Sequence, residues 1–381
     1  MANKRHRVAI LMHRWVGYLH GVQLGIAEYV AKRPEWICTH VRPDADGLKA
    51  VKTMPLDGMI AYVEAEYIPL LKSLHLPVID VSNWLLQEHF VRVIPDDRAI
   101  GATAAQYLAD LGLRHFGYWA YIDAAFSTLR LAGFRETLAK SDLKTRVWSD
   151  DLTIRDADAP ATTLEWLEKL PKPAGIFCPN DTIATMILDL CREAKIRVPE
   201  EVCILGVDDD ELLTQISHPP LSSIALHTQK IGFEAARLLD EMMSRPAAPA
   251  ASVLFPPVGV VARQSTNLLA IEDADVLAAV RYIRDHVHER LTVDDVLDAV
   301  PVNRRFLERR FKDHLGRTPL QEIRRVRIEK AKELLSGTDM SMPTVAKRSG
   351  FPNPERLANV FHAMTGMTPT QYRREFRLHD F

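Results

Sequence analysis

The sequence predicts an α/β fold with two lobes, followed by a separate all-α domain. Up to residue 263, short apolar runs alternate with longer helix-like segments, which is typical of doubly wound parallel sheets. Roughly 260 residues is long for one sheet, so we expect two lobes of similar build with a ligand between them. Beyond this point strand patterns stop, helical periodicity continues, and one stretch of sequence repeats itself.

The apolar runs predict buried strands, because parallel strands covered on both faces are continuously hydrophobic. These strands are expected at residues 8–12, 58–63, 77–81, 91–94, 115–119, 174–178 and 202–207. Helices between them are expected at residues 19–32, 98–111, 130–140 and 181–194. We therefore predict a two-lobed ligand-binding domain at 1–263 and an all-α domain at 275–381. A short linker without periodicity joins them at 264–274.

Charge is distributed unevenly along the chain. The net charge is −2, but the segment from Asp273 to the end holds 20 Lys and Arg against 16 Asp and Glu. A basic tail domain on an acidic body fits a phosphate-facing module beside a ligand-binding one. No apolar run is long enough for a signal peptide core or a membrane span, so we expect a cytoplasmic protein that does not contact membranes.

The four cysteines form no CxxC pair and no Cys/His cluster with zinc spacing. We therefore expect no metal, and we interpret the cysteines as small buried apolar residues in a reducing compartment. The sequence also lacks a glycine-rich phosphate loop, a GxSxG motif and a metal-ligand helix motif. These absences predict no cofactor and argue against a hydrolase or kinase.

The all-α domain contains a repeat offset by 50 residues without gaps. Each repeated residue type has a structural role: Asn caps a helix start, spaced apolar residues face a core, Gly ends the helix, and Thr-Pro begins the next. The identical pairs include Asn303 and Asn353, Leu307 and Leu357, Phe311 and Phe361, Gly316 and Gly366, Thr318-Pro319 and Thr368-Pro369, and Arg324 and Arg374.

The opposite faces of the two repeated helices are polar and differ from each other. The first presents Arg305, Glu308, Arg309 and Lys312, and the second presents Glu355, Arg356, Asn359 and His362. Arg, Asn and Glu have the donor and acceptor patterns that recognise base edges. A solvated surface is the alternative for a single helix. Here, however, a short helical segment precedes each one, at 291–299 and 341–349, which indicates two helix-turn-helix units.

Two such units can enter successive stretches of the major groove of double-stranded DNA, about 34 Å apart. A long helix at 320–335 would join them, and we expect some of its cations to contact phosphates. We expect Arg324 to contact phosphate, from the group Arg324, Arg325, Arg327, Lys330 and Lys332.

Residues 275–377 resemble the DNA-binding domain of AraC-type transcription regulators. The segments that carry the resemblance are LTVDDVLDAV, NRRFLERRFKDHLGRTPLQEIRRVRIEKAKELL and SMPTVAKRSGFPNPERLANVFHAMTGMTPTQYRR. The resemblance places the base-contacting positions at Arg305, Glu308, Arg309, Glu355, Arg356 and Asn359. Pro301 departs from the small residue or glycine usual in the first turn.

The body of the chain looks like the ligand-binding domain of LacI-type repressors, which is similar to periplasmic sugar-binding proteins. A family of pentose-operon regulators pairs it with an AraC-type domain, and this chain resembles that family along its whole length. The segments are KRHRVAILM, VPEEVCILGVDDDELLTQISHPPLSSI and VLDAV. The resemblance implies a homodimer that binds a sugar, D-xylose, and activates catabolic genes. Another sugar, or repression, remains the alternative.

Polar residues follow several predicted strands, where open α/β sheets bind ligands. Such groups can make the paired hydrogen bonds that a sugar requires. The candidates are Asp96, Arg130 (expected to open a helix, in STLRLAGF), Asn180, Asp181 and Asp208, with Trp15, Tyr18 and Trp84 as aromatic surfaces. The loop at 12–20 departs from the small polar residues usual in the LacI-type family.

Each candidate has a plainer interpretation. Asn180 and Asp181 can be helix caps, Asp208 can belong to a solvated turn, Arg130 can pair at the surface, and the aromatic rings can simply pack. Asp96 and Asp208 can also be imagined as a glycosidase pair. The attached DNA-binding domain favours ligand binding instead, so we expect no catalytic residues. An enzyme that also binds DNA is the distant alternative.

Overall fold

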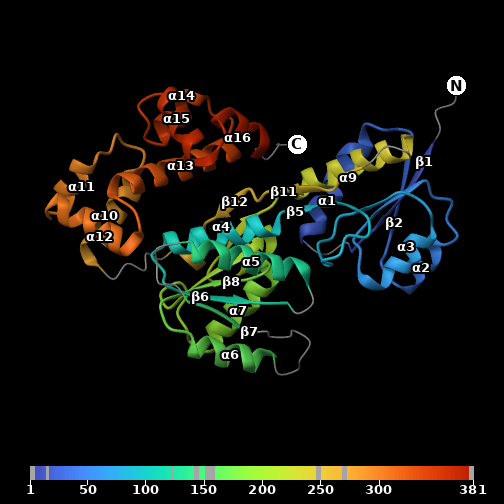
Figure 1. Ribbon diagram of the computed structural model, residues 1–381, viewed down its shortest axis with the longest axis horizontal. Coiled ribbons are helices and arrows are strands. Elements are labelled where there is room, and N and C mark those ends of the chain that lie inside the picture. Colours follow the sequence, from blue (N-terminus) through green and yellow to red (C-terminus); the bar gives the residue numbers. More distant parts are fainter. Residues whose placement is uncertain are drawn as a thin grey trace. The chain divides into compact units, whose positions relative to one another are not determined.

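The computed structural model describes residues 5–13, 17–121, 124–140, 146–150, 159–245, 250–267 and 273–376. It divides into two compact units. One is an α/β unit that holds most of the chain up to residue 268, and the other is an all-α unit that holds most of the rest. This composition confirms the predicted fold class (Figure 1).

The first lobe of the α/β unit contains a parallel sheet with strand order β11-β5-β4-β3-β1-β2. Its strands are β1 (His6–Leu11), β2 (Trp36–Val41), β3 (Gly58–Ala61), β4 (Val78–Asp80), β5 (Val91–Pro95) and β11 (Val253–Phe255). Its helices are α1 (Gly17–Ala31), α2 (Ala45–Val51), η1 (Ala65–Tyr67), α3 (Ile68–Ser73) and α9 (Thr228–Ser244).

The second lobe contains a sheet with order β12-β10-β9-β8-β6-β7, which is parallel except for β12. Its strands are β6 (His115–Trp119), β7 (Arg146–Asp150), β8 (Ala174–Phe177), β9 (Val202–Asp208), β10 (Ser222–Ala225) and β12 (Gly259–Val261). Its helices are α4 (Asp97–Asp110), α5 (Ala125–Ala139), α6 (Ala159–Lys169), α7 (Asp181–Glu193), α8 (Glu211–Ile216) and η2 (Gln264–Thr266).

The chain crosses between the lobes after β5, after β10 and after β11, so both lobes are built from separated stretches of sequence. The helix η2 packs into the second lobe, where Ser265 and Thr266 are buried and Ser265 Oγ donates to the Ile204 carbonyl at 2.6 Å. The first residues of the segment 264–274, which the sequence analysis treats as a linker, therefore belong to the α/β unit.

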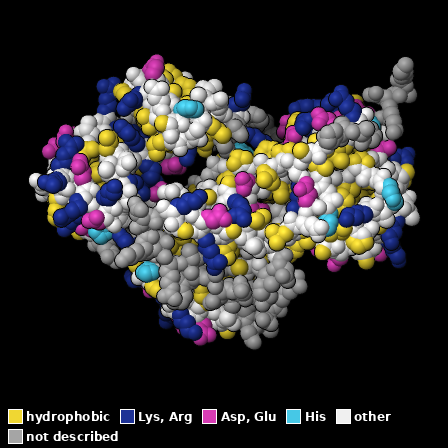
Figure 2. All heavy atoms as spheres, viewed as in Figure 1, with side chains coloured by type: hydrophobic (Ala, Val, Ile, Leu, Met, Phe, Trp, Pro, Cys, Tyr) yellow, Lys and Arg dark blue, Asp and Glu magenta, His cyan; other side chains and the backbone are white. Residues whose placement is uncertain are grey.

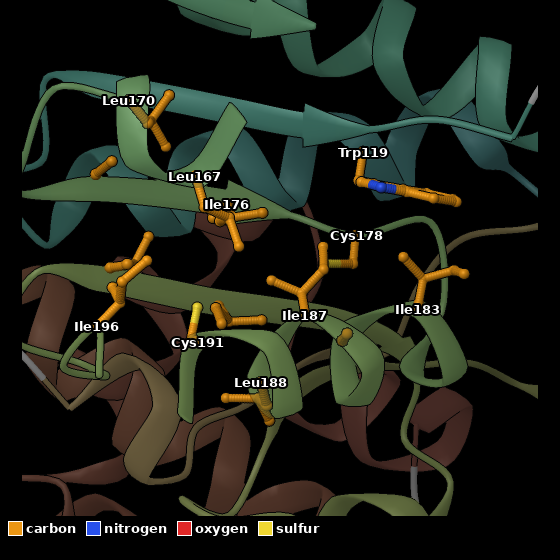
Figure 3. Packing of buried hydrophobic residues seen from close by; sticks show 14 of the residues in the cluster. Trp119, Leu167, Leu170, Ile176, Cys178, Ile183, Ile187, Leu188, Cys191 and Ile196 are labelled. Atoms are coloured by element: carbon orange, nitrogen blue, oxygen red, sulfur yellow. The ribbon is translucent and has the colours of Figure 1, made fainter. Parts of the chain in front are cut away.

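Apolar side chains between the sheet and α7 form the core of the second lobe. Ile187 and Cys191 of α7 lie over Ile176 of β8 and over Cys178, which follows this strand (Figure 3). All four side chains are fully buried. The four cysteines of the chain are free and three of them are buried, in agreement with the expectation that they act as small apolar residues.

Two glycines let α4 and α5 approach closely. A Cβ at Gly101 would lie 1.9 Å from the Arg130 carbonyl oxygen, and one at Gly133 would lie 2.1 Å from the Arg98 carbonyl oxygen. Only glycine fits such contacts, because any side chain would overlap the opposing backbone. The start of α4 and the middle of α5 are thereby brought side by side, and both carry functional candidates.

The all-α unit consists of α10 (Ala274–Asp285), α11 (Val293–Ala299), α12 (Arg304–Leu315), α13 (Pro319–Gly337), α14 (Met342–Arg348), α15 (Pro354–Thr365) and α16 (Pro369–Phe376). The repeated residues have the predicted roles. Asn303 and Asn353 cap α12 and α15 with their side chains. Gly316 and Gly366 end these helices in the left-handed conformation, at φ 67° and 75°.

We expect the substitution Gly101→Ala to separate α4 from α5, because the added methyl group would overlap the Arg130 carbonyl. The free energy of unfolding should fall by about 1–3 kcal/mol, the usual range for overpacking. Urea unfolding followed by tryptophan fluorescence checks this. Thr103→Ala, at a half-buried position two residues further along α4, is the control and should cost less. Equal stability of the Gly101→Ala variant and the unchanged protein would contradict the packing argument.

Candidate effector site and nucleic-acid interface

Arg130 lies at the junction of the two lobes with its side chain buried, at 3% exposure. Its Nε is 2.8 Å from Asp97 Oδ1, and a second guanidinium nitrogen donates to the Pro179 carbonyl. Asn83 Nδ2 donates to both Asp97 oxygens at 3.0 and 2.8 Å. Burial raises the pKa of Asp97 to about 6, although the charge of Arg130 and the hydrogen bond from Asn83 act to lower it.

The helix that carries Arg130 begins earlier than the sequence analysis expects. Helix α5 starts at Ala125, so Arg130 lies in its interior rather than opening it. The first amides of α5 donate to backbone carbonyls of the loop after β4: Ala125 N to Trp84 O at 2.8 Å and Phe126 N to Asn83 O at 3.0 Å. Because a distant backbone satisfies this helix start, no capping side chain marks it in the sequence.

Asp208 ends β9 with its carboxylate close to Arg130. Within the described residues the side chain makes no hydrogen bond or ion pair. Its backbone has φ 108°, a conformation that is costly for a residue other than glycine. Burial raises its pKa to about 7, helped by Asp210 and Asp97, while Arg130 lowers it. A strained, unpaired carboxylate beside a buried cation is typical of a ligand site.

Aromatic rings lie beside this polar cluster. The rings of Trp84 and Phe126 are 5.6 Å apart, those of Tyr121 and Phe126 are 5.7 Å apart, and Arg130 Cζ lies 5.1 Å from the Phe126 centroid. Trp84 and Tyr121 are only half-buried. Tyr18 is buried and donates to the Val81 carbonyl at 3.0 Å. Polar groups next to aromatic faces can hold a sugar, which has both hydroxyl edges and an apolar face.

The remaining candidates lie at helix starts. Asp96 Oδ1 accepts from Ala99 N at 3.0 Å, and Asn180 Oδ1 accepts from Ile183 N at 2.9 Å, which is the capping interaction. Asp181 accepts from Ser223 Oγ at 2.6 Å and from the Asp210 amide at 2.8 Å. One oxygen of Asp181 thus bonds to β10 and the other to the loop after β9. Trp15 lies outside the described residues.

Sequence reasoning missed Asp97, Asn83 and Tyr62. Asp97 adjoins the candidate Asp96, and Asn83 follows β4 in the same way that other candidates follow their strands. Tyr62 follows β3, and burial raises its pKa, with smaller contributions from Glu64, Asp208 and Asp80. All three residues could have been proposed from the sequence, because polar residues that follow strands often face the ligand.

The all-α unit exposes the polar faces of α12 and α15. All six predicted base-contacting residues are exposed. Of these, Arg305, Arg356 and Asn359 form no side-chain hydrogen bond or ion pair within the described residues. Glu308 instead meets Arg304, with 3.3 Å between Oε1 and Nε. Lys and Arg side chains are frequent along the α10–α12 edge of this unit, with acidic residues among them (Figure 2). Unpaired Arg and Asn on a helix face are available for bases or phosphates.

The cations of α13 divide into exposed and engaged residues. Arg324 is exposed, as a phosphate contact requires. Arg325 instead pairs with the fully buried Glu322 at 2.8 Å, and Arg317 lies on the other side of the same carboxylate. Burial by itself would raise the pKa of Glu322, but the hydrogen bond and charge of Arg325, together with Arg317, lower it to about 2. Arg325 thus stabilises the folded unit by pairing with a buried carboxylate.

Two other features are absent from the described residues. No group of His, Cys, Asp and Glu there is arranged to hold a metal ion. No helix there is both long and apolar enough to span a bilayer.

Comparison with known families identifies both units. Residues 105–266 match the periplasmic binding protein-like domain family, and residues 296–375 match a helix-turn-helix domain family. The two matches occur on the α/β unit and the all-α unit described above.

Relatives with both units align along the whole chain. The xylose operon regulatory protein of Escherichia coli strain K12 is 30% identical, with 98% of each chain covered. The protein of the same name from Haemophilus influenzae strain Rd is 28% identical, covering 98% of this chain and 99% of its own. A solved structure of a xylose-binding transcription activator is 29% identical, covers 99% of this chain and 100% of its own, and superposes with a TM-score of 0.63.

We expect Asp208→Asn to stabilise the α/β unit at high pH. The folded protein raises the Asp208 pKa to about 7, so the stability associated with the proton is present below about pH 4 and lost as pH rises through 7. Asn stays neutral, so the variant should gain on the order of 1–2 kcal/mol over the unchanged protein at pH 8, since solvent still reaches the side chain.

Urea unfolding at pH 5 and pH 8 checks this, followed by tryptophan fluorescence, because all six tryptophans precede residue 263. Asp46→Asn, at an exposed position of α2, is the control and should change little. If the Asp208→Asn variant is less stable than the unchanged protein at pH 8, the carboxylate has a structural partner and the prediction is wrong.

Proposed function

The chain belongs to the family of xylose operon regulatory proteins, and from this premise we propose that its α/β unit binds D-xylose and that its all-α unit then activates genes for pentose catabolism. It is a sugar-responsive, DNA-binding transcription regulator. The pentose and the activating sign are the parts that we propose, because relatives with both units carry xylose in their names.

The unpaired Asp208 carboxylate beside buried Arg130 is the observation that carries the sugar site. A carboxylate accepts hydrogen bonds from two sugar hydroxyls at once, and its own strain is offset when a ligand supplies those donors. Trp84 and Tyr121 provide half-buried rings on which the apolar face of a pentose can rest. Asp97 and Asn83 hold Arg130 in place, so the charged group meets the ligand already oriented.

Contacts between lobes offer a route from binding to regulation. The loop after β4 belongs to the first lobe, yet its Asn83 and Trp84 carbonyls accept from the start of α5 in the second lobe. A sugar that touches both lobes favours the arrangement in which these bonds are made. To switch the protein, the sugar must bind the DNA-competent arrangement more tightly than the other. We propose that this occurs in a homodimer.

On the DNA side we propose that α12 and α15 lie in successive major-groove segments. Arg305, Arg309 and Arg356 suit guanine, Asn359 suits adenine, and Glu308 and Glu355 suit cytosine. Arg324 contacts phosphate from α13. A regulator of this build needs no catalytic step, so we expect xylose to be recovered unchanged after incubation with the protein.

Thermal unfolding with a panel of pentoses and hexoses tests the effector. At a D-xylose concentration about 100 times its dissociation constant, the melting temperature should rise by roughly 5–10 °C through mass action. Asp208→Asn should abolish most of the rise, whereas the exposed control Asp46→Asn should keep it. A rise with another sugar and none with millimolar D-xylose would refute the choice of xylose.

Two arginine variants test the DNA assignment. Arg309→Ala removes a proposed base contact, so it should relax discrimination at one position of a selected site by about 1–3 kcal/mol. Arg324→Ala removes a proposed phosphate contact, so it should weaken binding to every duplex and lower the salt dependence by about one ion. Binding to selected and random duplexes at several salt concentrations separates these effects. Equal losses on random DNA would contradict the base-contact assignment.

A further inference from the structure

The two helix-turn-helix units meet directly at Gly350, which lies in the turn before α15. Gly350 has φ 77°, whereas Val300, its counterpart in the repeat, is extended at φ −124°. A Cβ at position 350 would lie 2.1 Å from the Val287 carbonyl oxygen and 2.9 Å from that of Glu289. Val287 and Glu289 belong to the loop between α10 and α11. Backbone of the first unit thus lies against the turn of the second.

Arg327 of α13 fills the same junction. Its Nη2 donates to the Glu289 carbonyl at 3.1 Å and to the Leu291 carbonyl at 2.8 Å. Its Cζ lies 6.0 Å from the Phe351 ring centroid, and its Nε would be 2.8 Å from a Cβ at Gly350. One guanidinium therefore contacts the first unit, the second unit and the helix that joins them. Arg327 is one of the cations considered above for phosphate contact, and these bonds engage it inside the protein instead.

Each helix-turn-helix unit also has apolar packing of its own. The first packs α10, α11 and α12 around residues such as Val296 and Phe311. In the second, the Phe361 ring meets that of Tyr372 at 5.2 Å between centroids. Each core packs on its own part of α13, and a helix by itself bends and twists along its length. The junction at Arg327 and Gly350 adds a second connection between the units.

We propose that Arg327 and Gly350 form a clamp that fixes the distance and angle between α12 and α15, and so sets the spacing of the two DNA segments that one chain binds together. This inference rests on the proposed function. One inserted base pair moves the second segment by about 3.4 Å and rotates it by about 35°. A rigid clamp makes binding sensitive to that change, whereas a loose one lets the second unit follow its segment.

The test uses the full chain and DNA selected by the unchanged protein from a randomised duplex library. Derivatives of the selected site carry one or two base pairs inserted or deleted between the segments. The unchanged protein should lose about 10-fold or more in affinity per inserted base pair, the usual effect of disrupting one base contact or more. Arg327→Met keeps the apolar stem of the side chain but removes the Nη2 donor of both hydrogen bonds. It should bind the original site more weakly and lose less than about threefold per insertion.

The control is Arg324→Ala, at an exposed position of the same helix. It should weaken binding to all derivatives equally and keep the spacing profile, which a general loss of stability would also leave unchanged. Arg327→Lys keeps a donor and should restore part of the spacing preference, and it replaces Arg327→Met if that variant does not fold. A spacing profile equal to that of the unchanged protein in a folded Arg327 variant overturns the clamp. A selection that yields no two-segment site would refute the proposed function instead.

Discussion

Burial of the Arg130 guanidinium is the constraint on which the arrangement of the α/β unit depends. A cation taken out of water loses hydration free energy of several kcal/mol, so it needs close anionic and carbonyl partners. Asp97 and the Pro179 carbonyl supply them from two other segments, and the glycine contacts of α4 and α5 bring Asp97 within reach. Asp208, at the end of β9, lies near this buried cation. The proposed ligand site therefore contains a cation that is already paired inside the protein.

The arginines of the all-α unit lie in two kinds of environment, one exposed to solvent and one inside the protein. Arg305 and Arg356 stand exposed on helix faces, where their hydration costs the fold nothing and leaves them available to DNA. Arg325 and Arg327 lie against carboxylate and carbonyl oxygens, where they stabilise the junctions of α13. The number of Lys and Arg residues in this unit is therefore larger than the number that can contact phosphate. Counting charges along the helix cannot separate the two groups, since the difference lies in what packs against each side chain.

Local physics made much of this structure predictable from the sequence. Helix caps such as Asn303 and stops such as Gly316 act within one turn of chain, so the repeat revealed them. The predicted strands are mostly interior ones, whereas β2, β7, β11 and β12 lie at sheet edges, where no continuous apolar run is needed. The site was predicted only approximately. Asp96 and Asp97 are neighbours, and only the rotation of α4 decides that Asp97 faces Arg130.

The contact at Gly350 makes the two repeated units unequal partners. The carbonyls that lie against this glycine come from residues 287–289, earlier in the chain and part of the first unit. The turn of the second unit fits against that loop only because position 350 is a glycine, whereas the corresponding position of the first unit holds Val300 in an extended conformation. The second copy of the repeat thus packs against the first through a contact that has no equivalent in the other direction. During synthesis from the N-terminus, the surface that completes the second copy is already made when that copy emerges.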